Sequence, residues 1–163
     1  MAEPRAASRQ VTPRLTIRRA TEADLPRIVG LLSQLALDDD RDSLVDPLPE
    51  SYRAAFRKVE ADPRQRLLVA DVGGRVMATA TLGIVANLSY RGRSWAFVEG
   101  LVVDRTARGR GYGEALVRYA IEEARRAGCY KVSLTSNKRR SEAHRFYEKL
   151  GFAATHEGFR ILL

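Results

Sequence analysis

The chain of 163 residues has one cysteine, two histidines, one tryptophan and no long apolar run. A single cysteine, Cys129, excludes an internal disulfide and fits a reducing compartment, so we expect a cytoplasmic protein in which Cys129 is a small packed residue. Two scattered histidines and one cysteine do not form a metal site, so we expect no metal. No apolar run approaches the ~18 residues of a membrane span, and residues 1–13 lack the apolar stretch of a signal peptide.

Aromatic residues are also scarce, at 7%, while the net charge is +8. A basic protein can bind nucleic acid, but few aromatic residues and an acidic segment make that partner a poor fit. The acidic segment, residues 38–50, holds six acids and one arginine and carries −5, so the remainder carries +13. A basic body suits an anionic cofactor, and the acidic segment suits a cationic substrate or is simply a solvated loop.

The pattern of apolar residues predicts a flexible segment over residues 1–13 and one domain over residues 14–163. The predicted elements, in chain order, are a strand at 15–18, a helix over about 22–35, a helix at 49–60, strands at 67–72, 76–88 and 96–103, a helix at 111–127, a strand at 131–135, a helix beginning at Ser141 and a broken strand over 152–162.

This order predicts a mixed α/β (α+β) domain with one sheet. Gly73 and Gly74 are typical of a two-residue hairpin, so the strands at 67–72, 76–88 and 96–103 should form an antiparallel meander. The helix at 111–127 then forces a crossover, which makes the strands at 96–103 and 131–135 parallel neighbours.

Residues 108–113, here called the glycine turn, read Arg-Gly-Arg-Gly-Tyr-Gly between a predicted strand and a predicted helix. Glycines let successive backbone N–H groups converge on an anion, and the following helix directs its unpaired N–H groups to the same point. Arg108 and Arg110 add charged donors. The turn therefore predicts a phosphorylated cofactor. The alternative is an ordinary glycine turn with exposed arginines, which would have the same residues.

The common phosphate-binding motifs do not match this turn. A dinucleotide fold requires a third glycine where Glu114 stands, and a P-loop requires a Gly-Lys-Ser/Thr ending. The remaining signatures of a protein kinase are absent as well.

Two motifs together resemble the GNAT acetyltransferase superfamily. The first is Arg108-x-x-Gly111-x-Gly113 after the apolar residues 101–103. The second resembles the superfamily's Ala-x-x-Phe-Tyr-x-x-x-Gly-Phe stretch, and its tyrosine, Tyr147, lies 34 positions after Gly113 of the first motif. It is carried by Ala143, Phe146, Tyr147, Gly151 and Phe152. The resemblance runs from about Leu15 to the C-terminus.

The resemblance implies the GNAT fold, a splayed parallel strand pair at the cofactor site, and acetyl-CoA as co-substrate without metal. It implies that backbone groups of residues 101–103 pair with the pantetheine arm and polarise the thioester carbonyl. It also implies that the glycine turn holds the pyrophosphate and that Asn137 contacts the cofactor. Lys138, Arg139 and Arg140 either meet the outer phosphate or form a solvated basic loop. The implied cofactor-binding residues are Leu101, Val102, Val103, Arg108, Gly109, Arg110, Gly111, Tyr112, Gly113, Asn137 and Tyr147.

The resemblance implies two catalytic residues, Tyr147 and Glu99. Tyr147 stands where the family places the acid, and a phenol with a pKa near ~10 can donate a proton to the leaving thiolate; otherwise Tyr147 belongs to the apolar stripe of its helix. Glu99 interrupts an apolar strand, and alternation puts it on the same face as Leu101 and Val103. We interpret Glu99 as the base, or else as a residue that holds the substrate or that faces solvent at the end of the strand; His144 and His156 are the competing bases.

We therefore expect an N-acetyltransferase that moves acetyl from acetyl-CoA to a primary amine by direct attack in a ternary complex. The expected acceptor is a small cationic molecule or a protein amine. A CoA-binding regulatory module that has lost catalysis is the alternative. Many relatives are dimers, so we also expect a homodimer.

Overall fold

The computed structural model describes residues 13–35 and 45–162. Residues 1–12 of the predicted flexible segment and most of the acidic segment lie outside these ranges. The elements are β1 (Leu15–Arg19), η1 (Glu22–Asp24), α1 (Leu25–Leu32), η2 (Ser33–Leu35), α2 (Glu50–Ala61), β2 (Gln65–Val72), β3 (Arg75–Val85), α3 (Ser89–Gly92), β4 (Trp95–Val103), η3 (Arg105–Ala107), α4 (Tyr112–Arg126), β5 (Val132–Leu134) and α5 (Ser141–Lys149).

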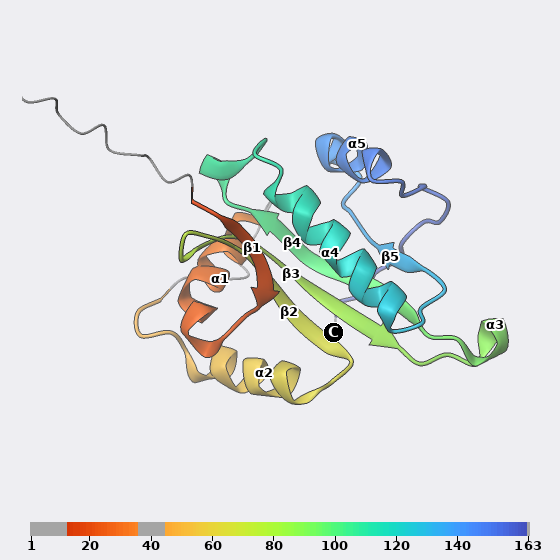
Figure 1. Cartoon of the computed structure of the whole chain (residues 1–163), viewed down its shortest axis with the longest axis horizontal. Coiled ribbons are helices and arrows are strands. Elements are labelled where there is room, and N and C mark those ends of the chain that lie inside the picture. Colours follow the sequence, from red (N-terminus) through yellow and green to blue (C-terminus); the bar gives the residue numbers. More distant parts are fainter. Residues whose placement is uncertain (1–12, 36–44, 163) are drawn as a thin grey trace, which may run out of the picture.

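The described strands form one mixed sheet in the order β1-β2-β3-β4-β5. The pairs from β1 to β4 are antiparallel and the pair of β4 with β5 is parallel, with α4 as the crossover between them (Figure 1). Gly73 and Gly74 make the hairpin between β2 and β3 with φ angles of 62° and 86°. The predicted meander, parallel pair and mixed α/β class are therefore confirmed.

Helices cover both faces of the sheet. On one face α4 buries its apolar side, including Leu116 and Ala120, against the central strands. On the other face α1 buries Ile28 and Leu31 against residues of β2, β3 and β4. Alternate residues of each central strand enter these two cores, as the period of two in a strand requires. α5 stands beyond β5 (Figure 1).

The alternation changes phase inside β4. Thr79 of β3 pairs with Val102 and Thr81 pairs with Glu99, so Gly100 and Leu101 together face Ala80. This is a β-bulge, and Gly100 takes the positive φ of 62° that such a bulge requires. As a result Val98 and Leu101 pack on the α4 face, while Val102 packs on the α1 face.

The C-terminal segment differs from the prediction. Residues 152–162 form no strand, because the three-residue β5 offers a short edge and the segment runs past it unpaired. Phe159, Ile161 and Leu162 are 93%, 82% and 78% exposed. The predicted strand at 76–88 also ends earlier, at Val85, where the chain enters the turn that holds α3.

None of the helices in residues 13–35 and 45–162 combines the length and the apolar character that a membrane crossing requires.

Candidate active site

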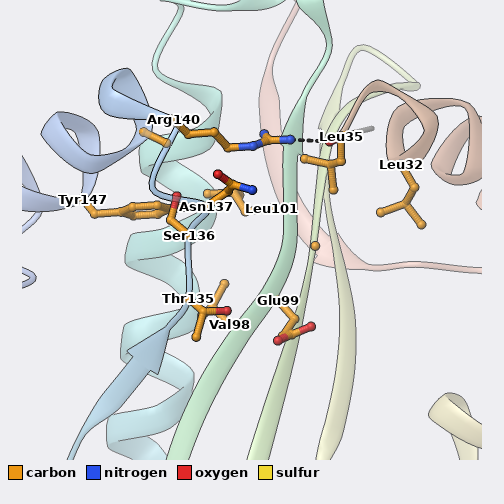
Figure 2. Close-up of a pocket in the computed structure, with 12 residues that line it drawn as sticks. Leu32, Leu35, Val98, Glu99, Leu101, Thr135, Ser136, Asn137, Arg140 and Tyr147 are labelled. Atoms are coloured by element: carbon orange, nitrogen blue, oxygen red, sulfur yellow. Dashed lines mark hydrogen bonds between the residues drawn. The ribbon is translucent and has the colours of Figure 1, made fainter. Parts of the chain in front are cut away.

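The two parallel strands separate soon after they meet. Their pairing runs from Ala96 with Val132 to Val98 with Leu134 and then stops. Beyond that point residues 99–101 and 135–137 border a cavity of about 280 Å³, here called the split cavity (Figure 2). Its lining comes from α1, η2, β4, the loop after β5 and α5: Leu32, Leu35, Val98, Glu99, Gly100, Leu101, Thr135, Ser136, Asn137, Arg140, Ala143 and Tyr147.

Glu99 lies at the split cavity, but on the opposite face of the strand from the one predicted. Leu101 and Val103 pack with the α4 core, whereas Glu99 follows Val98, which faces that core, and therefore points away from it. The bulge at Gly100 is the reason, because the extra residue reverses the alternation after it. The carboxylate of Glu99 is exposed beside the cavity.

Tyr147 reaches the same cavity from the other side (Figure 2). Its ring packs edge-on against Phe146 and Phe152, with centroid separations of 5.2 and 5.9 Å. Burial raises the pKa of its phenol, and the positive charge of Arg140 lowers it in part. Tyr147 therefore belongs to the apolar stripe of α5 and, at the same time, presents a protonated hydroxyl at neutral pH.

The glycine turn lies between the end of β4 and the first turn of α4. Gly109 and Gly111 have φ angles of 76° and 80°, and a methyl group on either would meet no atom within 4 Å. These two glycines are therefore required by backbone conformation. The first N–H groups of α4, beginning at Tyr112, have no preceding helical carbonyl and are available to an anion.

Gly113 has a different reason to be glycine. A β-carbon there would lie 3.0 Å from Cγ2 of Val103 and 3.6 Å from the ring of Phe146. The first turn of α4 thus packs directly on β4 and α5, which holds the glycine turn at the mouth of the split.

An ion pair under the glycine turn was not predicted. Asp104 is 5% exposed and its carboxylate accepts from the N–H and hydroxyl of Thr106, at 2.8 and 2.6 Å, and from Arg27 of α1. Hydrogen bonds from Thr106 and then Arg27 hold the pKa of Asp104 far below its ordinary value. The Asp-x-Thr spacing is a local turn signal, but only the fold brings Arg27 to it.

The loop from β5 to α5 is ordered by Asn137. Its side-chain oxygen accepts from the N–H of Arg139 at 2.9 Å, and its carbonyl accepts from the N–H of Arg140 at 2.9 Å. The side chain of Arg140 crosses the split cavity and donates to the carbonyl of Leu35 (Figure 2). Lys138 instead faces solvent beside Glu157, so the three basic residues do not form one solvated loop.

The remaining candidates lie away from the split cavity. Nε2 of His144 is 3.1 Å from the carbonyl oxygen of Asn137, Nδ1 of His156 is 2.7 Å from the hydroxyl of Thr155, and neither ring lines the cavity. Cys129 packs against the α4 core, as predicted. Within residues 13–35 and 45–162 no group of three His, Cys, Asp or Glu side chains could hold a metal ion.

The chain is similar to acetyltransferases of known activity. The profile of the acetyltransferase (GNAT) family matches residues 32–152. The chain is 38% identical to glucosamine 6-phosphate N-acetyltransferase 1 of Oryza sativa over 141 residues, which cover 83% of this chain and 79% of the relative. It is 30% identical to the aminoalkylphosphonate N-acetyltransferase of Salmonella typhimurium over 150 residues, which cover 91% and 92% of the two chains.

A solved structure shares the fold closely. The crystal structure of a transcriptional regulator from Bacillus halodurans superposes with a TM-score of 0.88 at 39% identity, covering 92% of this chain and all of that one. The family match over residues 32–152, together with the split sheet and the glycine turn, shows that the chain belongs to the GNAT family of acetyltransferases.

Proposed function

We propose that this acetyl-CoA-dependent N-acetyltransferase acetylates the primary amine of a small molecule that also carries a phosphate or phosphonate group. Two relatives are named for such acceptors, glucosamine 6-phosphate and aminoalkylphosphonates. The net charge of +8 suits an anionic acceptor as well as CoA. The proposed acetyl transfer depends above all on one observation: Tyr147 and Glu99 line one cavity beside β4, where the pairing of β4 with β5 has ended.

The split provides a place for the cofactor. Pairing with β5 stops at Val98, so in residues 101–103 the backbone groups on that side have no described strand partner and can pair with the pantetheine amides. The glycine turn takes the pyrophosphate, because its two open glycines leave room for an anion at the start of α4. The side-chain N–H₂ of Asn137 remains available to the cofactor.

The reaction needs one base and one acid. The acceptor arrives as an ammonium ion, and Glu99 removes its proton directly or through water. The amine then attacks the thioester carbonyl, whose oxygen is polarised by a backbone N–H of residues 101–103. Tyr147 donates a proton to the departing thiolate; burial raises the pKa of its phenol, so the phenol is protonated when the thiolate forms.

An acceptor screen tests the substrate class. Release of free CoA thiol is measured with glucosamine 6-phosphate, an aminoalkylphosphonate, a polyamine, an aminoglycoside and a lysine peptide. We expect turnover with the two phosphorus-containing amines at lower concentration than with the others. Preference for the polyamine or aminoglycoside would favour the purely cationic acceptor that the acidic segment suggested; most of that segment lies outside the described residues.

A second candidate is a CoA-binding regulator without catalysis. One observation favours it, since a close structural relative is described as a transcriptional regulator. Such a module would show thermal stabilisation by acetyl-CoA but release no thiol with any amine. Glu99 and Tyr147, both present at the cavity, favour the enzyme.

The protein is further proposed to act as a homodimer. Phe159, Ile161 and Leu162 are exposed on a segment that forms no strand, and β5 is one of the two edge strands of the described sheet. An extended apolar segment and an open strand edge on the same chain can pair between two copies. Light scattering during size exclusion checks this, and a monomer at micromolar concentration would contradict it.

A further inference from the structure

We propose that Arg140 is a positioning residue of the reaction: its guanidinium stabilises the tyrosinate that forms when Tyr147 gives its proton to the CoA thiolate. This inference rests on the acid role proposed above for Tyr147. It assigns to Arg140 a place in the chemistry rather than in the basic loop that binds the outer phosphate.

The geometry begins with α5. Arg140 precedes the first residue of this helix, and Tyr147 follows seven positions later, about two helical turns. Residues at this spacing lie on one face of a helix, and Ala143, between them, shares it. All three line the split cavity, and Figure 2 shows Arg140 and Tyr147 entering it from the same side.

Arg140 is held in place at both ends. Its backbone N–H donates to the carbonyl of Asn137 at 2.9 Å, and its guanidinium donates to the carbonyl of Leu35 on the facing wall. A carbonyl partner leaves the full positive charge in the cavity, whereas a carboxylate partner would cancel it. The neighbouring Lys138 points to solvent and does not line the cavity.

The charge is needed at one step. The N–C bond to the amine forms, the C–S bond of the thioester breaks, and the nitrogen, which is positively charged after the attack, releases one N–H proton to solvent to give the neutral amide. The O–H bond of Tyr147 then breaks as the S–H bond of CoA forms, which leaves a tyrosinate in a half-buried position. An uncompensated anion there is costly. Solvent later returns the proton to Tyr147, and the guanidinium exchanges none.

The other charged group that lines the cavity is Glu99, on the opposite wall. A carboxylate opposes ionisation of the phenol, so it does not share the role of Arg140. Phe146 of α5 and Phe152, which follows that helix, bury the ring of Tyr147 and carry no charge. Arg140 is therefore the described cation placed to favour the tyrosinate.

The first test needs no acceptor. The titration of Tyr147 is read from tyrosinate ultraviolet absorbance, as the difference between each protein and its Tyr147→Phe version. We expect Arg140→Gln to raise the pKa of Tyr147 and Arg140→Lys to keep it near the wild-type value. The matched control is Arg145→Gln, which removes an exposed charge from the same helix and should leave this pKa unchanged.

The second test is kinetic. Arg140→Gln should lower kcat roughly tenfold, the effect of one nearby unit charge, while acetyl-CoA affinity stays close to wild type. Combined with Tyr147→Phe it should cause little further loss, because both changes act on the same proton transfer. Arg140→Lys should keep most of the activity because it keeps the positive charge, whereas Arg140→Gln removes that charge and keeps an N–H donor for a carbonyl.

An unchanged Tyr147 titration in folded Arg140→Gln would overturn the inference, as would an equal loss in the presence and absence of Tyr147. Failure of the proposed function looks different: the wild-type protein would then acetylate no amine, while the titration would still show whether Arg140 acts on Tyr147.

Discussion

The two halves of β4 behave differently although they belong to one strand. From Ala96 to Val98 the strand pairs on both sides, and Ala96 and Val98 are 0% and 3% exposed. From Glu99 to Val103 it pairs with β3 alone, and a bulge at Gly100 leaves Glu99, beside the split cavity, on the opposite face of the strand from Leu101. The paired half adds to the core, whereas the open half has no described strand partner on the side of β5.

This difference is the physical reason why we propose that the chemistry takes place at the open half of β4. Unpaired backbone in a sheet is costly unless something replaces the missing partner, and an extended pantetheine arm with two amides can do so. The bulge serves the same end, since bulges redirect side chains next to active sites. Changes in the open half should therefore affect catalysis and cofactor binding, and changes outside it should affect stability.

The largest effect is expected for Tyr147→Phe. The phenyl ring keeps the packing against Phe146 and Phe152, but the proton for the thiolate is lost, so turnover should fall about a hundredfold. The Kd for acetyl-CoA should stay the same by calorimetry. Tyr119→Phe, which loses a hydroxyl on the α4 side of the sheet, is the control and should keep full activity. Unchanged turnover in Tyr147→Phe would remove this residue from the mechanism.

A smaller loss is expected for Glu99→Gln. Because the carboxylate is exposed and water can take over part of its role, kcat/KM for the amine should fall roughly tenfold to a hundredfold. Initial rates at saturating acetyl-CoA measure this. Glu148→Gln removes an exposed carboxylate from α5 and should be neutral. Equal rates for both variants would show that another group, or the solvent, accepts the proton.

The glycine turn can be compared with the other end of its own helix. Gly111 and Gly128 have similar φ angles, 80° and 72°, and open space around them, so replacement by alanine should cost each about 1 kcal/mol of stability. Only Gly111→Ala should weaken acetyl-CoA binding, by roughly tenfold, because its β-carbon and the altered turn disturb charge-assisted hydrogen bonds to the diphosphate. Calorimetric titration that found equal affinities would contradict the proposed phosphate site.

The smallest effect on activity is expected for Asp104→Asn, which removes the ion pair between Asp104 and Arg27. The folded-state pKa of Asp104 is depressed, so its ion pair stabilises the protein above the ordinary carboxyl pKa of about 4, and this contribution is lost as the pH falls toward the folded value. Asp104→Asn should cost about 1–3 kcal/mol at neutral pH and progressively less below pH ~4. Thermal melts across this range measure it, with the exposed Glu60→Gln as control; a pH-independent difference would contradict the assignment.

Much of the architecture could be predicted because its signals are local. Gly73 and Gly74 indicate a hairpin by backbone conformation alone, and the helix after the glycine turn forces the parallel pair. Tyr147 and Glu99, two of the residues that line the split cavity, were also identified, since they lie in recognisable sequence contexts. The orientation of Glu99 was wrong, because simple alternation cannot reveal that Gly100 takes a bulge rather than an ordinary strand position.

Arg140 and the final segment, residues 152–162, are two further features that local sequence signals could not predict. Nothing near Arg140 in the sequence indicates Leu35 as its partner, because 105 positions separate them and only the folded chain brings them together. The alternating residues near Ile161 resemble a strand, yet a strand forms only where an edge accepts it.

Taken alone, the order of amino acids determined the main helices, the strands from β1 to β5, the antiparallel meander with the parallel pair, and the two open glycines of the glycine turn, since each follows from short-range sterics and apolar periodicity. The tertiary structure alone decided where β4 and β5 part, which face carries Glu99, and that Arg27 and Arg140 meet Asp104 and Leu35. Those outcomes depend on contacts between distant segments, and such contacts exist only after the chain has packed.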